Sequence, residues 1–549
     1  MYGETSLFDT LAVVPIVVNA GAALFPAILA AVASVAAVVF KPKELFKICK
    51  TKPWIPLLVI LLSGGTWALV AFWPGESTET VSQRKRAAST ATQGIHGQAV
   101  NIDWTKIALA MINNQKQVSG PVVDPLTEPS NIHTDAKEFI FRAGPKRLGV
   151  IGSDLTGKMQ KAWHYYPRWI DEDGVEQEDT EAMILSSPAF YGDRVYGASC
   201  LLDPPDNYGA VFCLDAFTGK QIWSVSQIDN QDIKGFFSSP AVTFDGRYLV
   251  IGQGLHPDSN CNLICIDTAN GQVHWKFQVS LHIESSPVIV GDVVYVGCGA
   301  IEDPSTHKPI SHKGFVLAVR ISDGKELWRF DVADPESSPV VQDGILYIGS
   351  GFNGKAVVAL DLEADDQNRL LWSRPTSYPV TGAITLADEL VIAGGGNGDF
   401  VFRDPNPKGL VLALDKTTGQ VRWETEMPDA VLGAVAAGKY LICPVASGQV
   451  FAIDLDTGEK KWDSAVSGHT PVLAACAVTE NSVYAVSQDG YLAKLDIESG
   501  DIIEKVYINS MNRPGEQGLS ISSPLVVNGH LYVGSETGGL SCYTGGGNL

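Results

Sequence analysis

The chain has 549 residues, with 61 acidic and 40 basic side chains and a formal net charge of −21. This length exceeds that of one ordinary domain, although a repeat propeller can reach it as a single unit. The negative charge argues against a nucleic-acid partner, because phosphate binding requires a basic surface. The nine cysteines include no C-x-x-C pair, so neither haem attachment nor a common zinc motif is predicted.

The N-terminal residues 1–75 are predicted to form a membrane anchor. Two stretches without ionisable side chains, residues 11–40 and 54–73, are each long enough for a transmembrane helix. Residues 41–52, from Lys41 to Lys52, lie between them and carry five lysines. The positive-inside rule places this loop in the cytoplasm and the rest of the chain outside it. An alternative topology has only residues 54–73 spanning the bilayer.

Residues 76–137 are predicted to be a linker. The first part is rich in Ser, Thr and Gln, and Pro121, Pro125 and Pro129 follow. This composition is typical of extended or loose chain. A domain of repeats is expected from there, over residues 138–549.

One motif recurs through this domain, as in VFCLDAFTGKQIWSV from Val211, LICIDTANGQVHWKF from Leu263 and VLALDKTTGQVRWET from Val411. Each copy predicts a hairpin, in which an apolar strand enters an Asp-x-x-Thr-Gly turn and a second strand carries the Trp. A repeat of short strands every 40–60 residues or so is typical of a radial array.

A second motif alternates with the first and opens an inner hairpin. Ser-Ser-Pro begins at Ser186, Ser238, Ser285, Ser337 and Ser522, and weaker versions lie near Pro379, Val431 and Pro471. Each blade therefore has inner strands A and B and outer strands C and D. The array begins with a D strand at residues 158–166 and ends after a C strand, so the first D strand is expected to complete the last blade and close the ring. The sequence predicts an all-β, eight-bladed propeller preceded by two transmembrane helices, with seven blades as the nearest alternative.

The copies resemble pyrroloquinoline-quinone-type propeller repeats, whose signature is A-x-D-x-x-T-G-x-x-x-W, from about Phe139 to Tyr543. The resemblance implies that the Trp of each copy wedges between adjacent blades. No catalytic, cofactor-binding or metal-ligating residue is predicted. The residues expected to dock the blades are Trp163, Trp223, Trp275, Trp328, Trp372, Trp423 and Trp462.

Two branches of this family differ in function. Quinoprotein dehydrogenases hold the quinone and calcium in the channel, with adjacent cysteines over the cofactor and a calcium set of carboxylates and an amide. Here no two cysteines are adjacent, and the closest are Cys261 and Cys265. The other branch is non-catalytic and is similar to the propeller lipoprotein of the outer-membrane β-barrel assembly machinery, which binds proteins through loops. The resemblance therefore favours a non-catalytic, membrane-tethered scaffold without cofactor. A quinone- and calcium-dependent oxidoreductase and a ligand sensor are the alternatives.

Loop lengths predict which face binds a protein partner. A–B and C–D turns emerge on one face and are short, whereas insertions fall in the B–C and D–A loops, for example at residues 167–183, 201–209 and 300–313. The partner is expected on the face with the long loops, as the lipid contact is through residues 11–73. His307 and His312 share one loop but lack further ligands. The sequence leaves open whether Cys200 and Cys213 form a disulfide.

Overall fold

The computed structural model describes residues 57–63, 66–72, 142, 144, 146–170, 175–203, 206–299, 314–400, 403–510 and 519–546. The chain divides into two units, residues 1–99 and 100–549. Every element in the described ranges is a β-strand.

The first unit contains a hairpin where a helix was expected. Strand β1 (Leu57–Ser63) pairs antiparallel with β2 (Thr66–Phe72), with Leu62 opposite Trp67. The helix predicted over residues 54–73 is therefore corrected to two strands. A Gly-Gly pair separates the two apolar runs, and such a pair between short apolar segments favours a hairpin. The expected helix over residues 11–40 and the loop at 41–52 lie outside the described residues. In the part of the chain that the structure describes, no helix is long and apolar enough to cross a bilayer.

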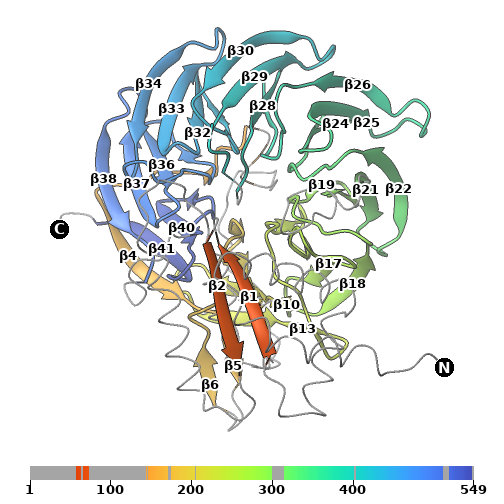
Figure 1. Cartoon of the computed structure of the whole chain (residues 1–549), viewed down its shortest axis with the longest axis vertical. Coiled ribbons are helices and arrows are strands. Elements are labelled where there is room, and N and C mark those ends of the chain that lie inside the picture. Colours follow the sequence, from red (N-terminus) through yellow and green to blue (C-terminus); the bar gives the residue numbers. More distant parts are fainter. Residues whose placement is uncertain are drawn as a thin grey trace, which may run out of the picture. The chain divides into compact units, whose positions relative to one another are not determined.

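The second unit is the predicted propeller, and its described strands form eight blades around a central channel (Figure 1). Blades are numbered in chain order and each is given from its inner strand A to its outer strand D. Blade 1 is β7 (Ala189–Tyr191), β8 (Arg194–Ala198), β11 (Val211–Asp215) and β12 (Gln221–Val225); blade 2 is β15 (Ala241–Val242), β16 (Tyr248–Gly252), β17 (Asn262–Asp267) and β18 (Val273–Gln278); blade 3 is β19 (Val288–Val290), β20 (Val293–Cys298), β21 (Gly314–Arg320) and β22 (Glu326–Val332); blade 4 is β23 (Val340–Gln342), β24 (Ile345–Ser350), β25 (Ala356–Asp361) and β26 (Leu370–Pro375).

The remaining blades follow the same order. Blade 5 is β27 (Thr385–Ala387), β28 (Leu390–Gly396), β29 (Gly409–Asp415) and β30 (Val421–Met427); blade 6 is β31 (Val435–Ala437), β32 (Tyr440–Pro444), β33 (Gln449–Asp454) and β34 (Lys460–Ala465); blade 7 is β35 (Ala477–Val478), β36 (Ser482–Val486), β37 (Tyr491–Asp496) and β38 (Ile502–Tyr507); blade 8 is β39 (Leu525–Val527), β40 (His530–Gly534), β41 (Leu540–Gly546) and β4 (Lys158–Tyr165).

The two ends of the repeat array meet in blade 8. The N-terminal strand β4 pairs antiparallel with the C-terminal strand β41, with His164 opposite Ser541. This is the predicted closure of the ring. The structure adds a fifth strand that was not predicted, because β3 (Val150–Ile151) pairs in parallel with the inner strand β39.

The burial of each strand follows its position in the blade. The C strands are apolar on both faces, and Val211, Phe212, Cys213 and Leu214 of β11 are fully buried. The D strands alternate between half-buried and exposed residues, as β18 does, because their outer edge faces solvent. Between the two, Asp215 accepts hydrogen bonds from the Thr218 N–H at 2.8 Å and the Thr218 hydroxyl at 2.7 Å. This fixes the turn that the repeat motif predicts.

Three additional hairpins extend from the blades. They are β5 (Arg168–Ile170) with β6 (Glu176–Glu178), β9 (Leu201–Asp203) with β10 (Asp206–Tyr208), and β13 (Gln227–Ile228) with β14 (Gln231–Asp232). All three lie in B–C or D–A connections. By contrast, the A–B turn has two residues in six blades of the described propeller.

Candidate functional site in the central channel

The tryptophans that recur in the repeat motif lie at the outer edge of the ring, away from the channel. The tryptophans are on outer D strands, and each of six indole N–H groups donates a hydrogen bond to a carbonyl oxygen of the next blade. The seventh, Trp328, contacts blade 4 in a different way. The Arg369 guanidinium of blade 4 lies over its indole, with Cζ 4.0 Å from the ring centre. The blade-docking role of the seven tryptophans stays a prediction, and these contacts are its structural basis. The six bonds are Trp163 to Ala216 (3.0 Å), Trp223 to Thr268 (2.8 Å), Trp275 to Ile321 (2.6 Å), Trp372 to Lys416 (3.2 Å), Trp423 to Leu455 (3.0 Å) and Trp462 to Ile497 (2.9 Å).

The Ser-Ser-Pro motifs line the channel and connect one blade to the next. The second serine of four of these motifs donates its backbone N–H to the hydroxyl of the corresponding serine one blade further on. The bonds run from Ser523 to Ser187 (3.1 Å), from Ser187 to Ser239 (2.9 Å), from Ser239 to Ser286 (3.0 Å) and from Ser286 to Ser338 (3.0 Å). We call these five residues the serine belt. The belt connects the segments that start the inner strands of five consecutive blades, from blade 8 through blade 1 to blade 4.

The segment before the first blade fills one end of the channel. Its backbone carbonyls accept hydrogen bonds from inner strands, Lys146 from Ala436 of blade 6 at 3.2 Å and Leu148 from Val478 of blade 7 at 2.8 Å. The Arg147 guanidinium donates to the carbonyls of Pro339 at 2.6 Å and Ile384 at 3.1 Å, directly before the inner strands of blades 4 and 5. Burial lowers the pKa of Arg147 to about 9. This segment ties blades 4 to 8 together from inside.

A cavity lies in the channel beside this segment, and Arg142 is part of its lining. Its walls come from the serine belt and from residues of the D–A and B–C connections, so it opens toward the face with the long loops. Part of the wall is apolar, and Phe237 and Phe400 meet there edge to face with ring centres 5.1 Å apart. The rest is polar and includes His256, Glu284 and Glu336. A cavity with mixed walls and few polar groups is typical of a ligand site.

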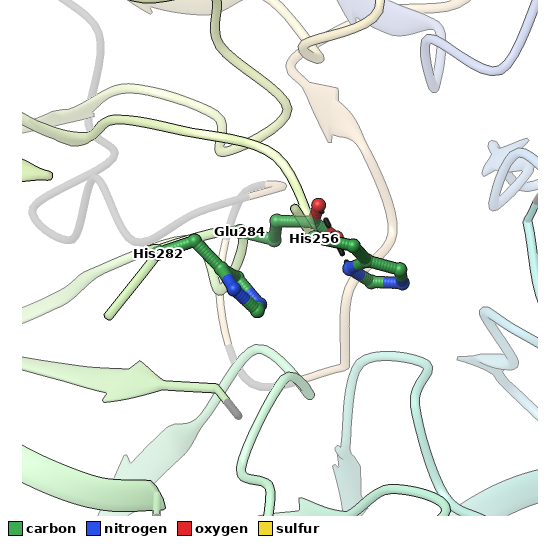
Figure 2. Close-up of side chains that lie close together, drawn as sticks. All are labelled: His256, His282 and Glu284. Carbon is green, nitrogen blue, oxygen red and sulfur yellow. Dashed lines mark ion pairs between the residues drawn. The ribbon is translucent and has the colours of Figure 1, made fainter. Parts of the chain in front are cut away.

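Two histidines and two glutamates from three connections cluster at the polar wall, with His256, Glu284 and Glu336 lining the cavity and His282 fully buried beside them. His256 belongs to the B–C loop of blade 2, His282 and Glu284 to the segment between blades 2 and 3, and Glu336 to the segment between blades 3 and 4. Figure 2 shows His282 and Glu284 on one stretch of chain with the His256 ring beside them. His256 Nδ1 lies 2.9 Å from Glu284 Oε1 and 3.5 Å from Glu336 Oε1, and His282 Nε2 lies 3.4 Å from Glu336 Oε1.

The two imidazoles have opposite electrostatic surroundings. Burial lowers the pKa of His256, but the carboxylates of Glu284 and Glu336 together outweigh burial and hold this pKa well above its usual value. Burial raises the pKa of Glu284, but His256 outweighs it and the pKa is lowered overall. Burial lowers the pKa of His282 to about 4. Near neutral pH the cluster therefore holds an imidazolium–carboxylate pair beside a neutral imidazole.

Sequence reasoning missed this cluster. His256 and His282 are far apart in sequence and on different loops, so no ligand spacing connects them. The one local signal is His282-Ile-Glu284 directly before a Ser-Ser-Pro motif, which places both side chains on one side of extended chain. His307 and His312, which sequence analysis did single out, lie outside the described residues. Cys200 and Cys213 are both buried free thiols, so they form no disulfide.

The fold and channel define a pyrroloquinoline-quinone-type repeat propeller. A family model described as outer membrane protein assembly factor BamB matches residues 207–306 and 312–544, which is more than half of the chain. The chain therefore belongs to the BamB family of propellers.

Individual relatives come from both branches of the fold. The chain is 29% identical to the outer membrane protein assembly factor BamB of Yersinia pestis over 276 residues, which is 46% of this chain and 60% of that protein. It is 25% identical to the dehydrogenase subunit of a quinone alcohol dehydrogenase of Gluconobacter oxydans over 317 residues, 51% of this chain and 36% of that protein. The crystal structure of BamB from Moraxella catarrhalis covers 71% of this chain, and this chain covers 98% of that one, with a TM-score of 0.50 and 17% identity, which shows the fold alone.

The channel does not match the quinone and calcium set that the dehydrogenase branch implies. Calcium takes oxygen ligands. The cluster in this channel presents two imidazoles among its four donors. Adjacent cysteines, which that branch places over the quinone, do not occur in the sequence. We therefore derive no reaction step through a quinone.

Proposed function

We propose that this protein is a binding scaffold of the cell envelope, whose propeller lies outside the cytoplasm and docks a protein partner on the face with the B–C and D–A loops. Membership in the BamB family supports this class of function, since the Yersinia pestis relative is an outer membrane assembly factor. The location outside the cytoplasm is proposed from this family membership.

The observation that carries the proposal is the confinement of added structure to one face. The hairpins β5–β6, β9–β10 and β13–β14 all lie in B–C or D–A connections. On the other face, most A–B turns have two residues, which is the minimum for a hairpin. Loops on a rigid scaffold carry recognition because they vary while the blades hold them in place. The varied face is therefore the one suited to a specific partner.

The charge of this face indicates the chemistry of the partner. Glu176 and Glu178 of β6 are exposed, and Arg168 pairs with Glu176 at 2.7 Å. The sequence adds Asp171, Glu172 and Asp173 between β5 and β6. Complementary charge steers association, so we propose a partner that presents a basic segment.

Site-specific cross-linking in cells tests this proposal. A photoreactive residue replaces Thr180, exposed after β6, or Thr417, exposed in a C–D turn of the opposite face, in the full-length protein. We expect a discrete adduct from position 180 and none from position 417. Reversing charge with Glu176→Lys and Glu178→Lys should weaken the adduct at least several-fold. An adduct from position 417 alone, or one indifferent to charge reversal, contradicts the proposed face and partner.

A further inference from the structure

We infer that His256, His282 and Glu284, with Glu336 as a fourth donor, bind a divalent transition-metal ion of the zinc class. This goes beyond the scaffold function and does not depend on it. In the part of the chain that the structure describes, His256, His282 and Glu284 form the one group of three or more possible metal ligands whose donor atoms all lie within 4.8 Å of one another.

Two separations between donor atoms match tetrahedral coordination and a third is shorter, and the donor atoms of His256, His282 and Glu284 lie within 4.8 Å of one another. Zinc–nitrogen and zinc–oxygen bonds of about 2.0–2.1 Å, at tetrahedral angles, place neighbouring donors roughly 3.3–3.4 Å apart. The separations of Glu336 Oε1 from His282 Nε2 and from His256 Nδ1 are 3.4 and 3.5 Å. The separation between His256 Nδ1 and Glu284 Oε1 is shorter, at 2.9 Å. An ion that replaced the proton between these two atoms would move them apart by a few tenths of an ångström.

The environment of His282 also indicates a bound ligand, independently of the donor spacings. Its side chain has no exposed surface, and neither ring nitrogen makes a hydrogen bond of good geometry in the structure. Burial of an imidazole without hydrogen bonds is unfavourable, because the ring leaves water and gains no compensating partner. The Nε2 atom points to Glu336, toward the centre of the cluster. A metal ion there would take the lone pair of a neutral imidazole, which is the form that ligates.

The surrounding chain leaves room for the cluster and fixes its members. A Cβ atom at Gly299 would lie 2.5 Å from His282 Nε2 and 2.9 Å from Glu336 Cγ, so only glycine fits beside these two side chains. Asp334 takes a positive φ of 54° two residues before Glu336, and the Glu336 N–H donates to the Asp334 carbonyl at 3.0 Å. This tight turn aims Glu336 at the two rings.

The donor set selects the class of ion. Two imidazole nitrogens and two carboxylate oxygens suit zinc and its neighbours among the first-row divalent metals. Calcium and magnesium prefer oxygen donors throughout. The ion would connect loops of blades 2, 3 and 4, and it would face the cavity on the side where His256 is 23% exposed.

Binding of Co²⁺ to the full-length protein tests the inference. The protein is purified without a histidine tag, stripped with a chelator, and titrated with Co²⁺ and then with Zn²⁺. We expect one Co²⁺ per chain with the intense visible absorption of tetrahedral cobalt, displaced by Zn²⁺ and not by Ca²⁺. His282→Ala should weaken binding at least ~100-fold. Glu284→Gln, which keeps the shape of the side chain, should do so as well.

The matched control is His274→Ala. His274 is an exposed histidine of blade 2, the blade that carries His256, and its ring stacks on Tyr248. This variant should bind Co²⁺ as the native protein does. Far-ultraviolet circular dichroism of the metal-free variants establishes that each is folded. Failure of the native protein to take up stoichiometric Co²⁺ overturns the inference whatever the variants do, and so does binding that survives both His282→Ala and Glu284→Gln.

Discussion

At the scale of single residues, the glycine and tryptophan of the repeat act across blade boundaries. The two are four positions apart in five copies, yet the glycine packs against the tryptophan of the preceding blade. A Cβ atom at Gly271 would lie 2.9 Å from the indole of Trp223, and Gly271 has a φ of +75°. The same relation holds between Gly324 and Trp275. These two turns thus need glycine both for their backbone and to admit the neighbouring ring.

Removing one of these rings should destabilise the propeller strongly. Trp223 is 3% exposed and its N–H is bonded across the boundary, so Trp223→Ala leaves a cavity and removes this hydrogen bond. We expect the free energy of unfolding to fall by about 3–5 kcal/mol. Urea unfolding, followed by far-ultraviolet circular dichroism, measures this change in the free energy of unfolding. Phe244→Ala, which removes a 62% exposed ring, should change stability by no more than about 0.5 kcal/mol. Equal effects would contradict the docking role.

The cysteines should be inert in the folded protein. The eight described cysteines are buried and free, and burial raises the pKa of Cys261, Cys476 and Cys542 to about 12. At pH 8 roughly one such thiol in ten thousand is a thiolate, which is the reactive form. In native buffer we expect none of these eight to react rapidly with a thiol reagent, so that at most one thiol, that of Cys49, is labelled. After unfolding in urea, all nine cysteines should react. Rapid native labelling of two or more would show that the blades open.

At the scale of elements, the junction between blades 7 and 8 is built differently from the others. Glu504 stands at the position of the tryptophan and accepts a hydrogen bond from the Met159 N–H of β4 at 2.8 Å. Lys494 donates to the Leu155 carbonyl at 2.9 Å, and the Tyr484 hydroxyl donates to Asp154 at 2.6 Å. The boundary at which the N-terminal strand joins the ring is thus held by polar contacts to the segment that leads into β4.

The pairing of β4 with β41 predicts a disulfide between distant parts of the chain. His164 and Ser541 are directly opposite each other, and opposed residues in an antiparallel pair have Cα atoms about 4.5–5.5 Å apart. The double variant His164→Cys and Ser541→Cys should therefore cross-link on oxidation. The gain in stability should be at most about 5 kcal/mol, because the closed loop is long. Altered mobility in a non-reducing gel and a raised melting temperature would report it.

A displaced pair is the control for this register. His164→Cys combined with Thr544→Cys uses a residue whose partner is Gln160, so its sulfurs are several strand positions apart. This pair should stay reduced under the same conditions. Cross-linking of both pairs alike, or of neither, would contradict the closure of the ring by β4.

At the scale of the whole molecule, the centre of the ring holds the blades together from inside. The serine belt joins consecutive blades, and the segment that carries Arg147 connects blades on opposite sides of the channel. The His256–His282–Glu284 cluster lies at the same centre, so an ion there would add a further connection among blades 2, 3 and 4.

Zinc should therefore stabilise the entire propeller and not one loop. An ion that binds only the folded state stabilises it by about 2.7 kcal/mol at a free concentration one hundred times its dissociation constant. We expect the melting transition to move to higher temperature as one cooperative step when Zn²⁺ is added, and to return when it is chelated. The His282→Ala variant should melt at the same temperature with and without Zn²⁺. An equal shift in that variant would place the effect elsewhere.

The repeats made most of the propeller predictable from the sequence. Local patterns specify a blade, because the apolar C strand, the Asp-x-x-Thr-Gly turn and the alternating D strand each encode their own geometry. The order of these elements also predicted that β4 would close the ring with β41, and the lengths of the loops predicted on which face β5–β6 and β9–β10 would lie.

The tertiary structure alone decided the rest. Uniform hydrophobicity over residues 54–73 favoured a helix, whereas the structure has two strands, β1 and β2, that pair with each other. The ring brings the loop of His256 beside the segment of His282 and Glu284, and it lets Arg147 reach Ile384, directly before the inner strand of blade 5. Spacing in the sequence carries no information about these contacts between distant residues, because residues at the centre of a ring become neighbours only when all the blades have closed around it.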